Sequence, residues 1–219
     1  MDNWYGKKFI ASYSGGKDSV FAVYKAIKAG FTPIELITTY NTEAGRSWFH
    51  GLTENIIRQV SDSLNIPVKL IKTVSEQYEE NFEKALTDAK NRGAEVCVFG
   101  DIDIEDHINW CALRCKNTGL IPYFPLYKED RKKAVYDFIE AGFSAIITIV
   151  DTSRLPASFL GYVLSRETAD LIEKSGADIC GENGEYHTFV FNGPIFAKKI
   201  DFSAETKLEN DKYYMLNIV

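Results

Sequence analysis

The chain has 219 residues, of which 45% are hydrophobic and 26% are charged, and its formal net charge is −6 at pH 7. This composition is ordinary for a folded globular protein and excludes a disordered or fibrous chain. The negative charge disfavours a broad surface for a nucleic-acid backbone, which usually needs clustered lysine and arginine, so we do not expect a nucleic-acid partner.

The first part of the sequence alternates short apolar segments with amphipathic segments. Strands are expected at residues 7–13, 34–40, 68–71 and 95–99, and helices between them at residues 18–30, from the end of a polar loop near residue 50 to 64, and at 76–92. Because parallel strands need crossover connections, this alternation predicts a doubly wound, mainly parallel α/β sheet with helices on both faces. Ligands of such sheets bind at the carboxyl ends of the strands.

The remaining sequence is less regular. Helices are expected at residues 106–118 and 131–141, a proline-bounded segment at 121–126, and a strand at 144–150. The last third contains a helix ending near Ser175 and strand-like runs at residues 188–191, 196–202 and 213–219. We therefore expect one large domain over residues 1–150 and a smaller C-terminal α+β lobe, for substrate binding, over residues 151–219.

Neither terminal signals nor cysteines indicate a secreted or membrane protein. The N-terminal segment has no basic region followed by an apolar stretch, and no apolar run approaches the ~20 residues that a membrane helix requires. The four cysteines are too scattered for a disulfide framework, and Cys111 and Cys115, four apart on a predicted helix, are expected to be buried thiols. We expect a cytoplasmic protein.

A glycine turn lies where the first predicted strand meets the first predicted helix. Backbone N–H groups and the helix dipole converge there on an anion, glycines allow close approach, and the lysine adds a positive charge. Ala11 and Asp18 depart from the ordinary NTPase loop, and so short a loop suits pyrophosphate. The alternative is a plain turn with an aspartate capping the helix. The turn consists of Ser14, Gly15, Gly16, Lys17, Asp18 and Ser19.

This turn resembles the SGGKDS signature of the PP-loop ATP pyrophosphatases, which adenylylate an oxygen and release pyrophosphate. Residues 181–188, with the sequence GENGEYHT, are similar to a signature of the diphthine–ammonia ligase branch, as are residues 100–102 and 119–126. His50-Gly51, residues 105–107 and Trp110 follow a pattern of bacterial relatives. The resemblance implies a PP-loop ATP-binding domain over residues 1–150 and ATP-dependent amidation of a carboxylate by ammonia.

The second signature also has a physical interpretation of its own. Its two glycines permit sharp bends, so that Glu182, Glu185 and His187 gather two carboxylates and an imidazole on one loop. Such a group can orient ammonia, accept its proton or bind a cationic substrate. A turn capped by surface carboxylates is the alternative. We place Glu182 and Glu185 with Lys17 and Asp18 among the catalytic candidates.

Further candidates follow the predicted strands. Asp101 ends the fourth strand, where a carboxylate can meet a Mg²⁺ ion bridging the ATP phosphates, or can simply cap the loop. Thr39 and Tyr40 follow the second strand, where this fold usually receives adenine. His50 can contact substrate or phosphate, or lie at the surface.

Arg114 is the last catalytic candidate. It lies one helical turn beyond Trp110 in a predicted helix and can stabilise charge on the α-phosphate.

The expected reaction uses ATP and Mg²⁺ and yields AMP and pyrophosphate, with ammonia as the nucleophile. The resemblance implies diphthine on a translation elongation factor as the carboxylate substrate, and we expect a homodimer. Two alternatives stay open: a ligase of the same superfamily acting on tRNA or another small acid, and a non-catalytic ATP-binding module.

Overall fold

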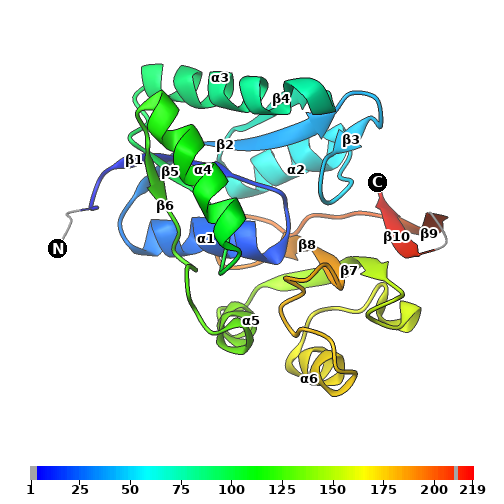
Figure 1. The fold of residues 1–219 in the computed structure, drawn as a ribbon. Coiled ribbons are helices and arrows are strands. Elements are labelled where there is room, and N and C mark those ends of the chain that lie inside the picture. The colour runs from blue at the N-terminus through cyan, green and yellow to red at the C-terminus, as the bar shows by residue number, and fades with distance from the viewer. Residues whose placement is uncertain (1–3, 210–211) are drawn as a thin grey trace. The chain divides into compact units, whose positions relative to one another are not determined.

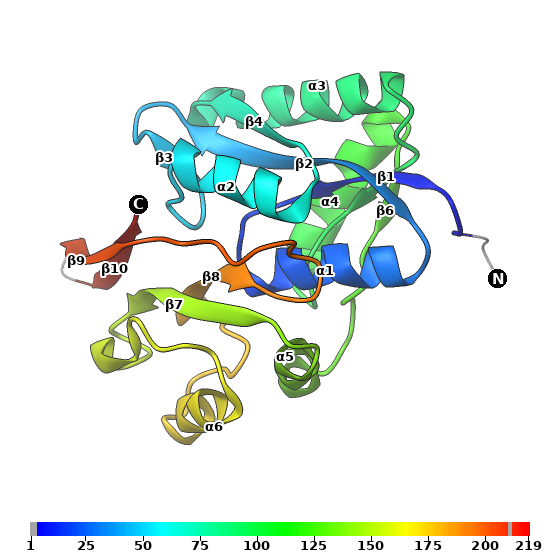
Figure 2. The same ribbon diagram turned by 180° about the vertical axis from the view of Figure 1, so that it is seen from behind.

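The computed structural model describes residues 4–209 and 212–219 and divides into two compact units. The first unit contains the segment up to Ser14, Asp18–Phe49 and Asn65–Lys128, and the second contains Gly15–Lys17, His50–Leu64 and Glu129–Val219. Each unit has its own β-sheet, which can be followed in Figures 1 and 2.

The first unit is built on a parallel sheet. β1 pairs on one side with β2 and on the other with β5, β4 joins β2, and β6 joins β5, all in parallel. The order along the sheet reverses beside β1, and such a switch point leaves a crevice at the carboxyl ends of the strands. The strands are β1 (Lys8–Ser12), β2 (Thr32–Asn41), the antiparallel β3 (Arg46–Ser47), β4 (Val68–Thr73), β5 (Val96–Val98) and β6 (Ile121–Tyr123).

Helices cover both faces of this sheet. α3 (Tyr78–Asn91) and α4 (Glu105–Thr118) lie on one face, and α1 (Lys17–Lys28) lies on the other (Figure 1). Phe82 and Leu86 of α3 and Cys115 of α4 form a single core cluster with strand residues such as Ile10. The short helix η1 (Ser75–Gln77) precedes α3. The expected doubly wound α/β fold is confirmed.

The second unit is built on an antiparallel sheet in the order β8, β7, β10, β9. Its strands are β7 (Ser144–Asp151), β8 (Tyr186–Asn192), β9 (Ala204–Glu209) and β10 (Tyr213–Ile218). α5 (Arg131–Glu140) and α6 (Arg166–Lys174) lie on one side of β7 and β8 (Figures 1 and 2). The unit also contains α2 (Glu54–Leu64) and the short helix η2 (Ala157–Phe159).

Local sequence explains where these helices begin. Asp130 accepts a hydrogen bond of 2.8 Å from the backbone N–H of Lys133 and so caps α5, and Ser165 caps α6 through the N–H of Thr168 at 3.2 Å. A buried carboxylate joins β7 to the start of β10, because Asp151 Oδ2 lies 2.8 Å from Lys212 Nζ.

Two expectations about elements were wrong. Residues 196–202 form no strand, and the strand of this region, β9, begins at Ala204. The apolar run is instead used for packing, because Ile200 is buried and the ring of Phe202 contacts the rings of Phe189 and Phe191. The second helix begins at Glu54 rather than directly after His50.

The structure also bears on the expectations about the cysteines and about membrane-spanning helices. All four cysteines are buried, so the expectation for Cys111 and Cys115 is confirmed. None of the helices in residues 4–209 and 212–219 has the length and apolar character that crossing a bilayer requires. The expected division of function near residue 150 stays a prediction.

Candidate functional site

The glycine turn connects β1 to α1, as the sequence predicts. In the first unit, its two ends are joined by serines: the backbone N–H of Ser14 donates to Ser19 Oγ at 3.2 Å, and the Ser14 hydroxyl donates to the same atom at 3.1 Å. Asp18 lies in the first turn of α1, where a carboxylate is favoured by the helix dipole. The turn therefore closes on itself at the start of a helix, where the positive end of the helix dipole favours an anion.

A pocket opens beside this turn at the carboxyl ends of β1 and β2, wholly within the first unit. Its aromatic walls include Trp48 and Tyr78, whose rings meet edge to face with 5.7 Å between centroids. The Tyr78 hydroxyl donates to Thr39 Oγ1 at 3.4 Å, and burial raises the pKa of Tyr78. We call it the nucleoside pocket, after the ligand that we propose for it below, and it is lined by Ser12, Tyr13, Ser14, Ile37, Thr38, Thr39, Ser47, Trp48, Phe49 and Tyr78.

Two polar atoms of the pocket walls have no protein partner. Among the described residues, the Tyr13 hydroxyl and Trp48 Nε1 are buried and make no hydrogen bond. Leaving a buried donor unsatisfied costs about 1–3 kcal/mol. A ligand with hydrogen-bond acceptors is the kind of molecule that could satisfy these groups.

The neighbouring candidate Tyr40 has a different environment from Thr39. Its hydroxyl donates to the carbonyl of Gly45 in the connection between β2 and β3, and its side chain is buried. Tyr40 is not among the residues that line the nucleoside pocket. The structure therefore brings Thr39 to the pocket, whereas the Tyr40 hydroxyl contacts the connection between β2 and β3.

Asp101 lies directly beyond β5. Its carboxylate is 3.7 Å from His107 Nδ1 and accepts a weak hydrogen bond from Cys111 Sγ at 3.9 Å. Burial is the largest influence on its pKa, which is raised, with a further upward contribution from Asp18 and a downward one from His107. The preceding residue, Gly100, allows the chain beyond β5 to pass close to the first turn of α1, because a Cβ at position 100 would lie 2.7 Å from the backbone of Asp18 and Ser19.

Arg114 is held by carboxylates of the neighbouring helix. The guanidinium forms ion pairs with Glu79 and, at 3.1 Å, with Glu83, and it lies over the ring of Trp110 at 5.3 Å. Its side chain is almost fully buried. These contacts fasten α4 to α3, and the action of Arg114 on the α-phosphate stays a prediction.

In the second unit, the middle of the glycine turn is bound to β8. The backbone N–H of Lys17 donates to Thr188 Oγ1 at 3.0 Å, and the N–H of Val190 donates to the carbonyl of Gly15 at 2.9 Å. Lys17 is nearly buried, and its ammonium lies 5.8 Å from the centre of the Tyr186 ring. A strand about 170 residues away in sequence thus fixes the orientation of this segment.

His50 belongs to the same group of contacts. Its Nδ1–H donates to the carbonyl of Thr188 at 2.8 Å, and its ring lies 5.1 Å from that of His187. Burial, His187 and Lys17 lower its pKa to about 3, against the opposing effect of the hydrogen bond to Thr188. The imidazole is therefore neutral at physiological pH.

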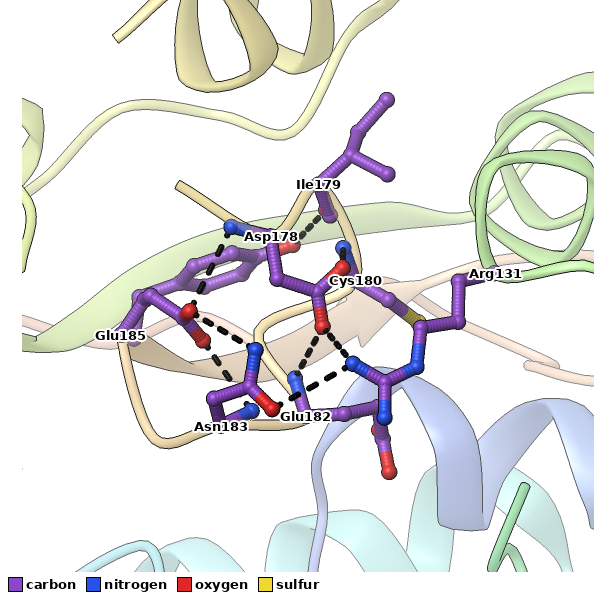
Figure 3. A network of polar contacts seen from close by, with 8 residues as sticks. Arg131, Asp178, Ile179, Cys180, Glu182, Asn183 and Glu185 are labelled. Carbon is purple, nitrogen blue, oxygen red and sulfur yellow. Dashed lines mark hydrogen bonds and ion pairs between the residues drawn. The ribbon is translucent and has the colours of Figure 1, made fainter. Parts of the chain in front are cut away.

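The second signature forms a tightly hydrogen-bonded loop (Figure 3). Glu185 is buried and accepts hydrogen bonds from the N–H groups of Asp178 and Asn183, at 3.3 and 3.1 Å. Asp178 in turn accepts from the backbone of Cys180 and Glu182 at 3.0 and 3.1 Å. Glu185 therefore organises the loop that carries Glu182, and the catalytic roles of both residues stay predictions.

Arg131 extends this network from α5. Its guanidinium binds the Asp178 carboxylate at 2.5 Å and reaches the side-chain oxygen of Asn183 at 3.5 Å (Figure 3). Such an ion pair connects the loop to the start of a helix.

Sequence reasoning missed the aromatic walls of the nucleoside pocket. Trp48 and Tyr78 are 30 positions apart and come from a loop and a helix start, so no spacing in the sequence links them. The only available signal was their position after the second and third strands of a parallel sheet.

Comparison with known proteins identifies relatives of the whole chain. The diphthamide synthase N-terminal domain model matches residues 7–122, and the diphthamide synthase C-terminal domain model matches residues 130–218. A zebrafish (Danio rerio) protein named diphthine–ammonia ligase is 24% identical over 93% of this chain and 90% of its own length.

Other relatives carry the same name. The Schizosaccharomyces pombe protein is 24% identical over 93% of this chain, which spans 37% of that longer protein, and the human protein is 36% identical over 39% of this chain and 34% of its own length. A solved structure, of a predicted subunit of tRNA methyltransferase from Methanocaldococcus jannaschii, aligns with 88% of this chain and with 100% of its own chain. The sequence identity is 15% and the TM-score is 0.47. With family models matched along both parts of its sequence, the chain belongs to the diphthamide synthase family.

Proposed function

We propose that this protein is an ATP-dependent ligase that adenylylates a substrate carboxylate, releases pyrophosphate and transfers ammonia to form an amide. The observation that carries the proposal is the match of both diphthamide synthase domain models, with the SGGKDS turn at the corner between β1 and α1. Relatives matched over most of the chain are named diphthine–ammonia ligase. The nucleoside pocket beside the turn supports ATP as the nucleotide.

In the first step, a carboxylate oxygen attacks the α-phosphorus of ATP. The bond between the α-phosphorus and the bridging oxygen breaks, and pyrophosphate leaves with the electron pair. The positive end of the α1 dipole and the ammonium of Lys17 stabilise the negative charge on the leaving group. The hydroxyls of Ser14 and Ser19 add hydrogen-bonding capacity at the two ends of the turn.

In the second step, ammonia attacks the acyl carbon of the adenylate. AMP leaves with the electrons of the acyl–oxygen bond, and the nitrogen loses a proton as the amide forms. We assign the orientation of ammonia and the acceptance of this proton to the loop of the second signature, with Glu182 as the proposed base. Glu185 supports that loop from its buried position.

Carboxylates of the first unit are the candidate ligands for magnesium. Burial and, to a smaller extent, the neighbouring charge of Asp18 raise the pKa of Asp101. A divalent cation bound to oxygen ligands relieves such repulsion. We propose that Asp101 holds Mg²⁺, which when bound would neutralise charge on the ATP phosphates.

The acceptor we propose is diphthine on a translation elongation factor, following the names of the relatives. The test is incubation of the purified protein with ATP, ammonia and elongation factor carrying diphthine, followed by mass spectrometry of the modified peptide. We expect replacement of a carboxyl oxygen by nitrogen, dependent on both ATP and ammonia. An unmodified peptide alongside consumed ATP would show that the acceptor is a different acid. The homodimer and the cytoplasmic location stay predictions, to be tested by sedimentation and by imaging.

A further inference from the structure

The imidazole of His50 occupies the space beside Gly16. A Cβ built on Gly16 would lie 2.3 Å from His50 Cε1 and 2.9 Å from Nε2, closer than real Cβ contacts occur. Gly16 does not have the positive φ that favours glycine, whereas Gly15 does, with φ of 85°. The need for glycine at position 16 therefore comes from a side chain packed against it rather than from its backbone conformation.

The other edge of the same ring is fixed to β8. His50 Nδ1 donates to the Thr188 carbonyl, while the Thr188 hydroxyl accepts from the N–H of Lys17. One residue of β8 thus contacts both His50 and the turn, and the next hydrogen bond along the strand joins Val190 to Gly15. All of these residues belong to the second unit.

We propose that His50 is a positioning residue, which holds the Gly15–Lys17 segment against β8 so that the turn and the Lys17 side chain are in place before ATP binds. A glycine pair loses more conformational freedom on ordering than any other dipeptide, so a turn of this kind benefits from an external support. Orientation in advance removes a reorganisation cost from the step in which pyrophosphate leaves. The role deepens the proposed function and rests on it only for this catalytic consequence.

The charge state of His50 agrees with this role. The charged groups that contact or influence the ring are His187 and Lys17, both of which lower its pKa, as burial does. The Thr188 carbonyl fixes Nδ1–H as the donor, and a pKa of about 3 leaves the ring neutral, so no second positive charge competes with Lys17 for the phosphates. We therefore expect the support to persist across physiological pH.

The first test measures amide hydrogen exchange by NMR, which requires no turnover. The His50→Ala variant should accelerate exchange of the Lys17 and Val190 amides about tenfold, because one supporting hydrogen bond and the packed ring are lost. The His50→Asn variant, whose side-chain amide can replace Nδ1–H, should restore most of the protection. His107→Asn is the matched control, because His107 is an exposed histidine of the first unit. Unchanged exchange in His50→Ala, or no rescue in His50→Asn, would overturn the proposal.

The second test is a double-mutant cycle on ATP affinity, measured by calorimetry. Gly16→Ala should weaken ATP binding about a hundredfold in the native background, because the added methyl collides with the imidazole, and about tenfold or less in the His50→Ala background. Equal losses in the two backgrounds would show that Gly16 is needed for close approach of phosphate alone. Thermal unfolding of each variant verifies that it is folded.

The two proposals fail in different ways. If AMP forms normally but the His50 substitutions change neither the amide hydrogen exchange nor the ATP affinity, the positioning role is wrong and the reaction stands. If the turn responds to His50 as described but no AMP forms with any acid acceptor, the reaction is wrong and the support of the turn stands.

Discussion

The two parts of the glycine turn are held in different ways. Ser14 and Ser19, in the first unit, bond to each other across five positions of sequence. Gly15 and Lys17, in the second unit, bond to β8, whose residues are more than 170 positions away. A short chain segment can close a turn by itself, but in this protein the N–H of Lys17 and the carbonyl of Gly15 are hydrogen-bonded to a distant strand. Substitutions in the two units should therefore separate binding of the nucleoside from handling of the phosphates.

The largest effect is expected at the turn itself. Replacing Lys17 with alanine removes the ammonium proposed to stabilise the departing pyrophosphate, and we expect the rate of pyrophosphate release to fall about 10²–10³-fold. A coupled pyrophosphate assay measures this rate. Lys28→Ala, an exposed lysine on the same helix, is the control and should retain the native rate. Full turnover by the Lys17 variant would remove the turn from the mechanism.

A glycine of the first unit tests the approach of β5 to the turn. The methyl of Gly100→Ala would meet the backbone of Asp18 and Ser19 at 2.7 Å, and backbone cannot move aside as a side chain can. We expect a loss of about 3 kcal/mol in the free energy of unfolding, measured by urea titration. In Gly93→Ala, the added methyl meets no atom within 4 Å but the residue has φ of 99°, so this variant isolates backbone strain and should lose about 1 kcal/mol. Equal losses would contradict the close approach.

The ion pair between the buried carboxylate of Asp151 and the partly exposed Lys212 should give a pH-dependent stability. Burial tends to raise the pKa of Asp151, but hydrogen bonds from Lys212 and Ser153 outweigh it, so the pKa is lowered. The unfolded chain then binds a proton first as pH falls, and the stabilisation present at neutral pH is lost below the ordinary carboxyl range. Asp151→Asn should therefore cost about 2 kcal/mol at pH 7 and progressively less in acid, measured by urea unfolding.

An exposed pair serves as the control for this comparison. Lys133 and Asp137 are one helical turn apart at the surface of α5, and Asp137→Asn should change the free energy of unfolding much less than Asp151→Asn does. If Asp151→Asn lowered the free energy of unfolding as little as Asp137→Asn does, the Asp151–Lys212 ion pair would not stabilise the second sheet.

The nucleoside pocket should give a smaller effect, confined to affinity. Trp48→Ala removes an aromatic wall and a buried N–H donor, and we expect the Kd for ATP to rise about tenfold, or ~1.4 kcal/mol. Trp48→Phe keeps an aromatic ring but lacks the N–H donor, so its Kd for ATP should lie between those of the native protein and Trp48→Ala. Trp4→Ala, whose ring stacks on Phe31 outside the pocket, is the matched control. Calorimetry with ATP measures all three, and a native Kd for Trp48→Ala would exclude this wall from binding.

The sequence predicted the first unit better than the second, and for a physical reason. In a parallel α/β sheet, buried strands and amphipathic helices alternate, and ligands bind at strand ends, where the candidates Ser14, Thr39 and Asp101 lie. In the second unit, apolar residues such as Ile200 and Phe202 pack without forming a strand. The apolar run at residues 196–202 therefore led to a wrong prediction of a strand. Contacts between distant residues, such as that of Thr188 with Lys17, leave no periodic signal.

The central claim is that the protein cleaves ATP between the α- and β-phosphates by attack of a carboxylate. The most direct measurement uses an acceptor whose carboxylate carries ¹⁸O, with ammonia and ATP, and follows the products by ³¹P NMR and mass spectrometry. The account predicts pyrophosphate and AMP, with one ¹⁸O transferred from the carboxylate to the AMP phosphate. ADP and orthophosphate, or AMP without the label, would contradict it.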